Sequence, residues 1–376
     1  MARGARPFAY RRAPRRLTLG CLRRLARLRR YATRVSKRAD DPANAPTLTD
    51  WSQYLALRTA CSLLEPYSPD QSIQTARAIA SVYARFTGKR IERARTNIAR
   101  CFPEKSRDET ERLAVDSVRN MFELFMVDAI VMPKIVREWS WQRYATLTDF
   151  GDTLDLLLGD KPCIFLTGHV GNWEFLGYFL ALIGFRMTAL ARPLDNPLIY
   201  EWLLRAREAS GLRILTKWGA TEELQRIIES GGKIAFIADQ NAGDDGMFVP
   251  VFNRLASSYK SIGLLAMRYR IPIVAGVARR LGHRFRYEIS ATDIIRPEEW
   301  ESQDDPLYYI TARYNRAIEM MIRACPEQYL WVHRRWKSRP KHEREGQPMP
   351  ERLRKKLRSL PWMTEDLLCE LGKPIA

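Results

Sequence analysis

The sequence predicts an α/β protein in which a central, mostly parallel or mixed sheet is covered by helices and preceded by a helical subdomain. Two patterns support this fold class. Short apolar runs alternate with amphipathic segments over residues 149–324, as in a sheet with helical cover. Residues 51–144 carry helical patterns only. Hydrophobic residues make up 46% of the 376 residues, a share that supports a folded core and excludes a disordered chain.

Composition divides the chain into four segments. We expect a basic arm and linker over residues 1–50, a helical region over 51–145, an α/β core over 146–340 and an accessory tail over 341–376. A chain of this length can bury one large core or two modest ones.

The basic charge of the protein is concentrated in the arm. Residues 1–38 hold fourteen arginines and lysines and no acidic residue, so the net charge of +19 falls to +5 for the rest of the chain. A nucleic-acid-binding protein would instead carry its cations across a folded face. Apolar residues recur in the arm at spacings of three and four, which predicts a basic amphipathic helix on an anionic membrane surface. A disordered tail and a targeting peptide are the alternatives. The recurring residues are Leu17, Cys21, Leu25, Leu28, Ala32 and Val35.

The helical region begins with two helices separated by prolines. One covers residues 51–64 and ends before Pro66, and the next starts after Pro69 and continues to Phe86, as helix start and stop signals predict. A longer helix lies between residues 107 and 131. Its apolar face, which predicts packing in a core, consists of Leu113, Val118, Phe122, Phe125 and Met126.

Strands and helices alternate in the core, after a helix at residues 149–158. The last strand alternates apolar and polar residues, which favours a mixed sheet. Strands are predicted at residues 162–168, 186–191, 212–216, 233–238, 273–278 and 284–291. Helices are predicted at residues 173–183, 195–209, 220–230, 256–270 and 306–324.

A candidate general base follows the first strand of this series. His169 stands directly behind residues 162–168, at an edge of the sheet where chemistry is often located. Gly171 permits a close backbone approach and Asn172 is a good N-cap, so a helix starting at the next residue would bring Glu174 toward the imidazole. A carboxylate on one ring nitrogen leaves the other free to remove a proton from a hydroxyl. The alternative is an ordinary structural hydrogen bond.

Three motifs resemble one family of enzymes. The run from His169 to Glu174 resembles the H-x4-D/E motif of lipid acyltransferases, in the wording of the late acyltransferases of lipid A biosynthesis. Residues 92–104 resemble the N-terminal signature of that family, and residues 326–337 closely match its closing signature. Residues 246–256 depart from the family pattern, because Asn253 and Leu255 replace a glycine and a proline, so no contact is inferred there.

The resemblance implies a glycerolipid-acyltransferase-like fold and a membrane-associated O-acyltransferase. The acyl donor would be an acyl carrier protein or coenzyme A thioester, and the acceptor a lipid A precursor or another glycolipid such as a phosphatidylinositol mannoside. His169 would act as base and Glu174 would hold it, while backbone N–H groups of residues 168–172 would bind the oxyanion. The apolar helix at residues 173–183 would be buried or border the acyl chain. A non-catalytic membrane-binding adaptor is the alternative.

Further polar residues follow other strands and the closing signature. Arg192 suits a phosphate or a developing negative charge, or a surface ion pair. Asp239 orients His169, binds the acceptor or caps a loop, and we rank it behind Glu174. Arg334 and Arg335 lie among aromatic residues and suit a phosphorylated headgroup. His333 competes as a base, although its basic neighbours disfavour its protonation.

The remaining composition excludes several classes of site. The six cysteines show no C-x-x-C spacing, so neither a zinc site nor a disulfide framework is predicted, and a reducing compartment is expected. The histidines and acids lack metal-ligand spacing, and we expect no cofactor. The longest stretches without charge, residues 162–173 and 175–185, are shorter than the roughly 20 residues of a membrane span. If the protein meets a membrane, we therefore expect it to lie on the surface, and the family resemblance implies the cytoplasmic face of the inner membrane.

Overall fold

The computed structural model describes residues 45–191, 193–216 and 220–372. The chain divides into two compact units, Met1–Ser52 and Gln53–Ala376. The basic arm predicted over residues 1–38 lies outside the described residues. At the end of the first unit, the carboxylate of Asp50 accepts hydrogen bonds from the N–H and the hydroxyl of Thr47, at 2.8 and 2.7 Å. This contact fixes the start of helix α2 (Leu48–Leu64), three residues before the predicted start.

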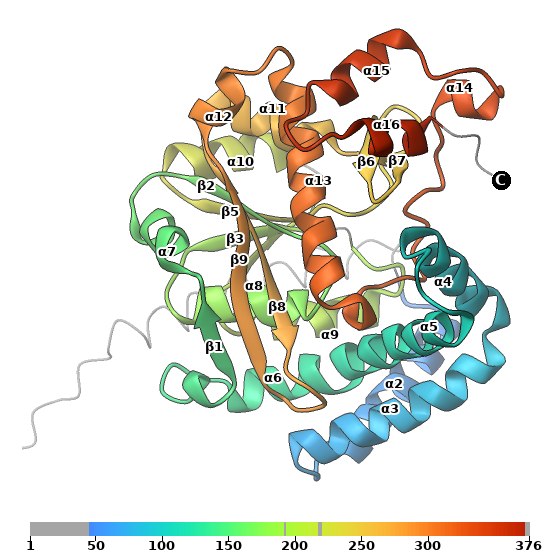
Figure 1. Cartoon of the computed structure of the whole chain (residues 1–376). Coiled ribbons are helices and arrows are strands. Elements are labelled where there is room, and N and C mark those ends of the chain that lie inside the picture. The colour runs from blue at the N-terminus through green and yellow to red at the C-terminus, as the bar shows by residue number, and fades with distance from the viewer. Residues whose placement is uncertain (1–44, 192, 217–219, 373–376) are drawn as a thin grey trace, which may run out of the picture. The chain divides into compact units, whose positions relative to one another are not determined.

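Helices fill the first part of the second unit, as predicted. Helices α3 and α5 both begin with a capping box, in which Ser68 pairs with Gln71 and Ser106 with Glu109. They pack against each other at the lower side of Figure 1. Helix α4 and a π-helical turn were not predicted. The elements are α3 (Pro69–Phe86), α4 (Gly88–Cys101), α5 (Arg107–Phe122), the π-helix η2 (Glu123–Asp128) and α6 (Ala129–Ile135).

A seven-stranded mixed sheet forms the centre of the second unit, which confirms the predicted fold class. Its strand order is β1-β9-β8-β2-β5-β3-β4, and all neighbours are parallel except β8 and β9. Six of its strands coincide with or overlap the predicted ones, and β1 was missed. The strands are β1 (Ala145–Thr148), β2 (Cys163–Thr167), β3 (Met187–Leu190), β4 (Arg213–Leu215), β5 (Lys233–Ile237), β8 (Ile273–Arg280) and β9 (Tyr287–Ile295).

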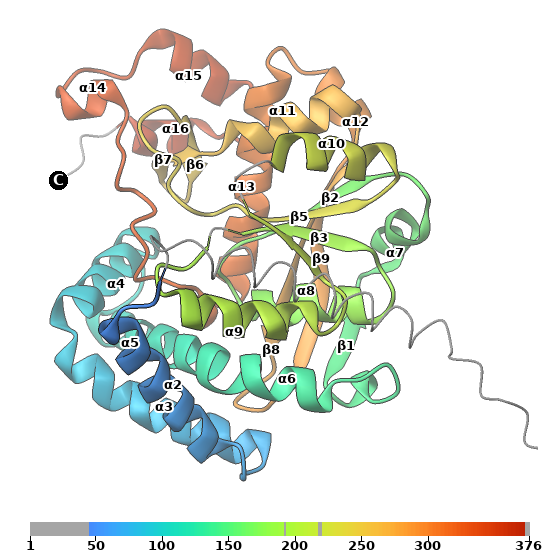
Figure 2. The same cartoon turned by 180° about the vertical axis from the view of Figure 1, so that it is seen from behind.

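Both faces of the sheet are covered by helices. Side chains of β2 alternate between two apolar cores, with Ile164 and Leu166 in one and Cys163 and Phe165 in the other. Figure 2 shows α10 and α11 over one face, and α8 and α9 over the other. The covering helices are α7 (Gly151–Leu158), α8 (Trp173–Leu182), α9 (Pro197–Glu208), α10 (Ala220–Glu229), α11 (Lys260–Tyr269), α12 (Pro297–Glu301) and α13 (Pro306–Ala324).

The predicted helix at residues 256–270 is wrong in its first turn. Strands β6 (Met247–Val251) and β7 (Arg254–Ser258) pair as an antiparallel hairpin, and the helix begins only at Lys260. The hairpin turns at Phe252, whose φ of 55° lies in the left-handed region. The turn lies in the segment where Asn253 and Leu255 stand in place of the glycine and proline of the family pattern.

The C-terminal part of the chain returns to the sheet edge before it forms short helices. A 3-10 turn η4 (Pro326–Gln328) opens residues 326–337, which we call the closing segment. The tail then contains α14 (Lys341–Arg344), α15 (Glu351–Arg358) and α16 (Glu365–Leu371). Within the described residues, no helix combines the length and apolar character needed to cross a membrane.

Candidate active site

The register of two parallel strands brings a histidine and an aspartate together. Thr167 at the end of β2 is paired with Ile237 at the end of β5, and His169 and Asp239 each follow two residues later. The Nδ1 of His169 lies 2.7 Å from Oδ1 of Asp239, and the His169 backbone N–H donates to Oδ2 at 3.0 Å. Two contacts between the same residues fix the ring orientation and the turn together.

The environment of this pair keeps the carboxylate charged. The side chain of Asp239 is 2% exposed and that of His169 is 13% exposed. Burial alone would raise the pKa of Asp239, but the charges and hydrogen bonds of His169, together with His333, bring it well below its usual value. The edge of the His169 ring meets Trp173, with centroids 4.9 Å apart. The imidazole is therefore confined but not sealed from solvent.

His333 lies next to His169 and was considered as a competing base. The two ring centroids are 4.7 Å apart. Burial and the neighbouring His169 lower the pKa of His333 to about 4, so this ring is neutral at physiological pH. Among the described residues, only His169 carries the carboxylate contact that a general base requires.

The expectation that Glu174 orients His169 is wrong. Both oxygens of the Glu174 carboxylate bind the guanidinium of Arg207 on α9, at 2.7 and 2.5 Å, and one also accepts the indole N–H of Trp173 at 3.2 Å. The first turn of α8 directs Glu174 toward α9 rather than toward the strand end. Asp239, which we had ranked second, occupies the position beside the imidazole.

Residues 168–172, which we call the catalytic turn, are bound to the scaffold on two sides. Gly171 donates its N–H to Gln328 O at 3.1 Å, Asn172 donates to Ala278 O at 2.7 Å, and Leu330 donates to His169 O at 3.0 Å. Gly171 has a φ of 62°, and a Cβ there would collide with the carbonyl of Ala278, so the predicted close backbone approach is confirmed. The N–H groups of residues 169, 171 and 172 are already donors within the fold. They are not free to bind an oxyanion, contrary to our expectation for these three.

Asn172 is buried and acts as a structural link rather than a surface contact. Its side-chain oxygen caps α8 by accepting the N–H of Phe175 at 2.8 Å, which confirms the predicted N-cap. Its amide donates to Asp128 at 2.7 Å and to the hydroxyl of Tyr287 at 3.1 Å. All of its polar atoms therefore point into the protein.

Beneath Asn172 lies a buried charged cluster that the sequence did not predict. Asp128 ends the π-helix η2 and is paired with Arg280 of β8, which also contacts Glu123 at 2.9 Å. The Oδ1 atom of Asp128 is buried and accepts no hydrogen bond from the described residues. Burial raises the pKa of Asp128 to about 6, against the opposing effect of Arg280. Insertions of π-helix frequently mark functional sites, and this one places two acids under the catalytic turn.

The predicted cationic residues lie in three different situations. Arg192 lies outside the described residues. Arg335 is 2% exposed, and its guanidinium donates only to neutral groups, which include Gln240 O and Asn315 Oδ1, so it ties the closing segment to the core. Arg334 is exposed, so a ligand can reach it.

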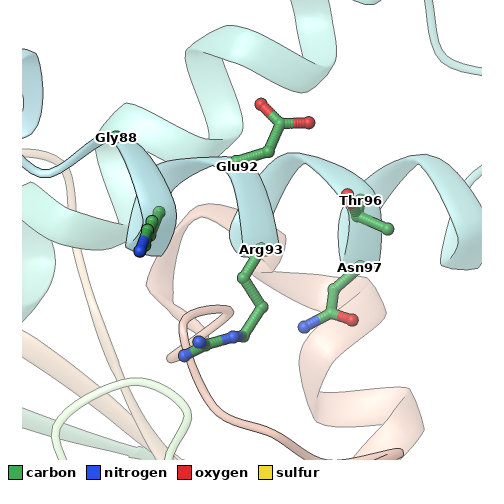
Figure 3. Close-up of a pocket in the computed structure, with 6 residues that line it drawn as sticks. Gly88, Glu92, Arg93, Thr96 and Asn97 are labelled. Atoms are coloured by element: carbon green, nitrogen blue, oxygen red, sulfur yellow. The ribbon is translucent and has the colours of Figure 1, made fainter.

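A cavity of about 560 Å³ lies along α4, close to the closing segment. Figure 3 shows Arg93 and Asn97 pointing to the same side of the helix, whereas Glu92 points away. Arg93 donates to Val332 O at 3.1 Å, and Asn97 donates to His333 O at 3.2 Å. The cavity lining does not include His169. Helix α8 is buried in the core, so the alternative that it borders an open acyl-chain site is not seen here. The cavity is lined by Gly88, Lys89, Glu92, Arg93, Thr96 and Asn97.

Metal chemistry has no site among the described residues. No group of three or more histidine, cysteine or acidic side chains is arranged to hold a metal ion there. The five cysteines with described surroundings are free thiols. That the protein works without a cofactor stays a prediction.

Fold and site together define an α/β protein with a histidine and carboxylate pair at the carboxyl edge of its sheet, an arrangement suited to activating a hydroxyl group. The family model described as bacterial lipid A biosynthesis acyltransferase matches residues 49–338. The chain belongs to this family, as the resemblance of its motifs predicted.

Curated relatives agree with the family model. The chain is 26% identical over 266 residues to the lipid A biosynthesis lauroyltransferase of Escherichia coli (strain K12), covering 68% of this chain and 82% of that protein. It is 24% identical over 263 residues to the palmitoleoyltransferase of the same organism, covering 68% and 81%. The corresponding myristoyltransferase is 25% identical over 257 residues, covering 66% and 75%.

Proposed function

We propose that this protein transfers a fatty acyl chain from an acyl thioester to a hydroxyl group of a lipid A precursor, with His169 as general base and Asp239 as its partner. The observation that carries the proposal is the 2.7 Å contact between His169 Nδ1 and Asp239 Oδ1 at the sheet edge. Membership of the family supports acyl transfer in lipid A biosynthesis as the activity. The relatives are named for three different acyl groups, so the acyl chain itself is left open.

The hydrogen bond sets the protonation state of the imidazole. Asp239 is acceptor only while it is ionised, so Nδ1 carries the proton and donates it, and the tautomer follows from this contact. The Nε2 lone pair is then free to accept a proton from an acceptor hydroxyl. The carboxylate also stabilises the imidazolium that forms, which is the established role of an acid behind a catalytic histidine.

The proposed reaction proceeds without a covalent enzyme intermediate, because the thioester is already activated. As His169 removes the hydroxyl proton, the oxygen attacks the thioester carbonyl and forms a tetrahedral intermediate. Its collapse breaks the carbon–sulfur bond, and the proton on His169 passes to the departing thiolate. The products are an ester of the glycolipid and a free thiol. Positioned base catalysis of this kind contributes about 10²–10⁴ in rate.

We assign Glu174 a positioning role in this mechanism. Its paired contact with Arg207 joins the first turn of α8 to the last turn of α9, and α8 begins directly after the catalytic turn. The ion pair thus holds the helix that follows the turn, whereas Asp239 contacts the turn itself. With this assignment, loss of Asp239 should affect mainly the chemistry, and loss of Glu174 mainly the folding of the protein.

The donor and the place of action follow from the same proposal. We propose an acyl carrier protein or coenzyme A thioester as donor, and a peripheral location at the cytoplasmic face of the inner membrane. Arg334, exposed beside His333, is the proposed contact for a phosphate of the acceptor.

The test is a direct assay of acyl transfer. The full chain is incubated with an acyl thioester and a lipid A precursor, and free thiol and acylated lipid are both measured. His169→Ala is expected to lower the rate of thiol release by about 10²–10⁴. His283→Ala is the matched control, because His283 is exposed in the loop between β8 and β9. Equal thioester consumption by wild type and His169→Ala would disprove the proposal.

A further inference from the structure

Helix α3 has an apolar stripe on each of two opposite faces. One face is buried through Ile73, Ala76, Ala80 and Ala84. Next to this face, Arg77 binds Asp116 of α5 at 3.1 Å and Glu123 of η2 at 2.5 Å. The opposite face is exposed. It carries Ile79, Val82 and Phe86, which we call the α3 stripe, at the spacing of three and four that aligns side chains along a helix.

The α3 stripe is exposed to a degree that is unusual for large apolar side chains. Ile79 is 41% exposed, Val82 53% and Phe86 83%. Two leucines of the neighbouring α2, Leu55 and Leu63, are also exposed. Single exposed apolar residues need no explanation, but a run along one helix face marks an interaction surface.

Charges beside the α3 stripe are positive. Arg85 and Lys89 are exposed, and neither forms an ion pair within the described part of the chain. Three acids in this part of the chain have partners of their own: Glu92, one helical turn after Lys89, is paired with Arg95 at 3.1 Å, Asp70 accepts the N–H of Phe285 at 2.9 Å, and Glu65 binds Lys134 at 2.9 Å. An apolar stripe beside cations without ion pairs matches an anionic lipid surface better than the mixed surface of a protein.

The position of the stripe in the chain favours the same occupant. It ends at Phe86, and the cavity on α4 begins at Gly88. Asn97, which lines that cavity, donates to the backbone of His333, and the His333 ring lies beside that of His169. The stripe therefore lies on the helix that directly precedes the helix in contact with the candidate site.

We propose that the α3 stripe is a membrane-docking surface, with its apolar side chains in the lipid interface and Arg85 and Lys89 at the anionic headgroups. This rests on the proposed function in one respect, because an enzyme that acylates a membrane glycolipid must bring its site to the lipid. Docking through α3 presents the cavity on α4 to the headgroup layer. The surface is distinct from the basic arm, which lies outside the described residues.

The experiment compares full-length variants in a vesicle sedimentation assay without acyl donor. The vesicles contain equal amounts of phosphatidylethanolamine and phosphatidylglycerol, and the salt concentration is raised until the contribution of the basic arm is screened. The triple variant Ile79→Gln, Val82→Gln, Phe86→Gln is expected to partition on the order of tenfold less, because buried apolar area sets interfacial binding. Leu264→Gln with Met320→Gln is the matched control, since both side chains are exposed and lie on α11 and α13.

Each other outcome overturns the proposal in a defined way. Unchanged vesicle binding together with a lower mass in light scattering would assign the stripe to a second copy of the chain. Unchanged binding and mass, with faster proteolysis of residues 1–44, would assign it to the arm. Acyl transfer to a detergent-dispersed acceptor is measured in parallel. If the wild type shows no acyl transfer in this assay, the proposed function is refuted. If the wild type transfers the acyl chain and the triple variant binds vesicles as well as the wild type does, only the docking surface is refuted.

Discussion

The side-chain amide of Asn172 lies 2.7 Å from the carboxylate of Asp128, which ends the π-helix. The same asparagine caps α8 and follows the turn that carries His169. One side chain therefore connects the turn of the candidate base to a buried charged cluster, whose two acids lie more than forty residues earlier in the chain. The site depends on contacts that hold the turn as much as on the residues that perform chemistry.

Asp239→Asn is expected to lower kcat for acyl transfer by about 10²–10⁴, because the amide does not stabilise the imidazolium and no longer fixes the tautomer. KM should change little, since the carboxylate is buried behind the ring. Steady-state kinetics with the full-length variant measure both constants. An unchanged kcat would show that Asp239 does not act through His169.

Glu174→Gln is expected to act mainly on folding. Removing one partner of this largely buried pair leaves Arg207 uncompensated, which costs about 3 kcal/mol of unfolding free energy. The double variant Glu174→Gln, Arg207→Met should recover part of this loss, because it removes the unpaired charge. Urea unfolding measures both. A stable single variant with no activity would instead give Glu174 a direct chemical role.

Asp128 is expected to make folding stability fall as pH rises. Its pKa is about 6 in the folded protein, against 3.8 for the free group, so the folded state binds this proton more tightly than the unfolded state. The contribution is fully present below about pH 4 and is lost as pH rises through 6, a change on the order of 3 kcal/mol. Urea unfolding is compared below pH 4 and above pH 6, and the full-length Asp128→Asn variant should lack this change in stability. An identical pH dependence in both proteins would contradict the assignment.

Gly171→Ala is expected to displace the catalytic turn. The new Cβ would strike the carbonyl of Ala278, in addition to the strain of a positive φ. Gly282→Ala is the matched control, since Gly282 has a φ of 61° but open space around it. We expect the first variant to lose acyl transfer and the second to lose only about 1 kcal/mol of stability. Equal activity of the two variants would show that the close approach is unimportant.

Local signals in the sequence were sufficient to predict the fold class and to select His169 as a candidate base. Apolar runs and breakers marked six of the seven strands of the sheet, and Asn172 was recognised as a cap from its type and position. Strand β1 was missed because it pairs with β9, which is distant in the sequence. The hairpin of β6 and β7 was missed because the sequence departs there from the family pattern. The π-helix was missed because its sequence continues the apolar pattern of α5.

The partner of His169 was misassigned for a different reason. Glu174 is near in sequence, whereas Asp239 is near only because β2 and β5 are neighbours, and no local pattern reports which strands pair. His169 and Asp239 both stand two positions after the end of a strand, and this was the signal that the sequence offered. Arg207, which binds Glu174, lies in the last turn of helix α9, and nothing in the local sequence indicated its role.

The closing segment has a consequence for how the enzyme is made. Residues 328 and 330 hydrogen-bond to the backbone of Gly171 and His169, so a ribosome must synthesise the chain through residue 330 before the turn acquires its support. A nascent or prematurely terminated chain that already contains both His169 and Asp239 is thus expected to remain inert toward cellular thioesters.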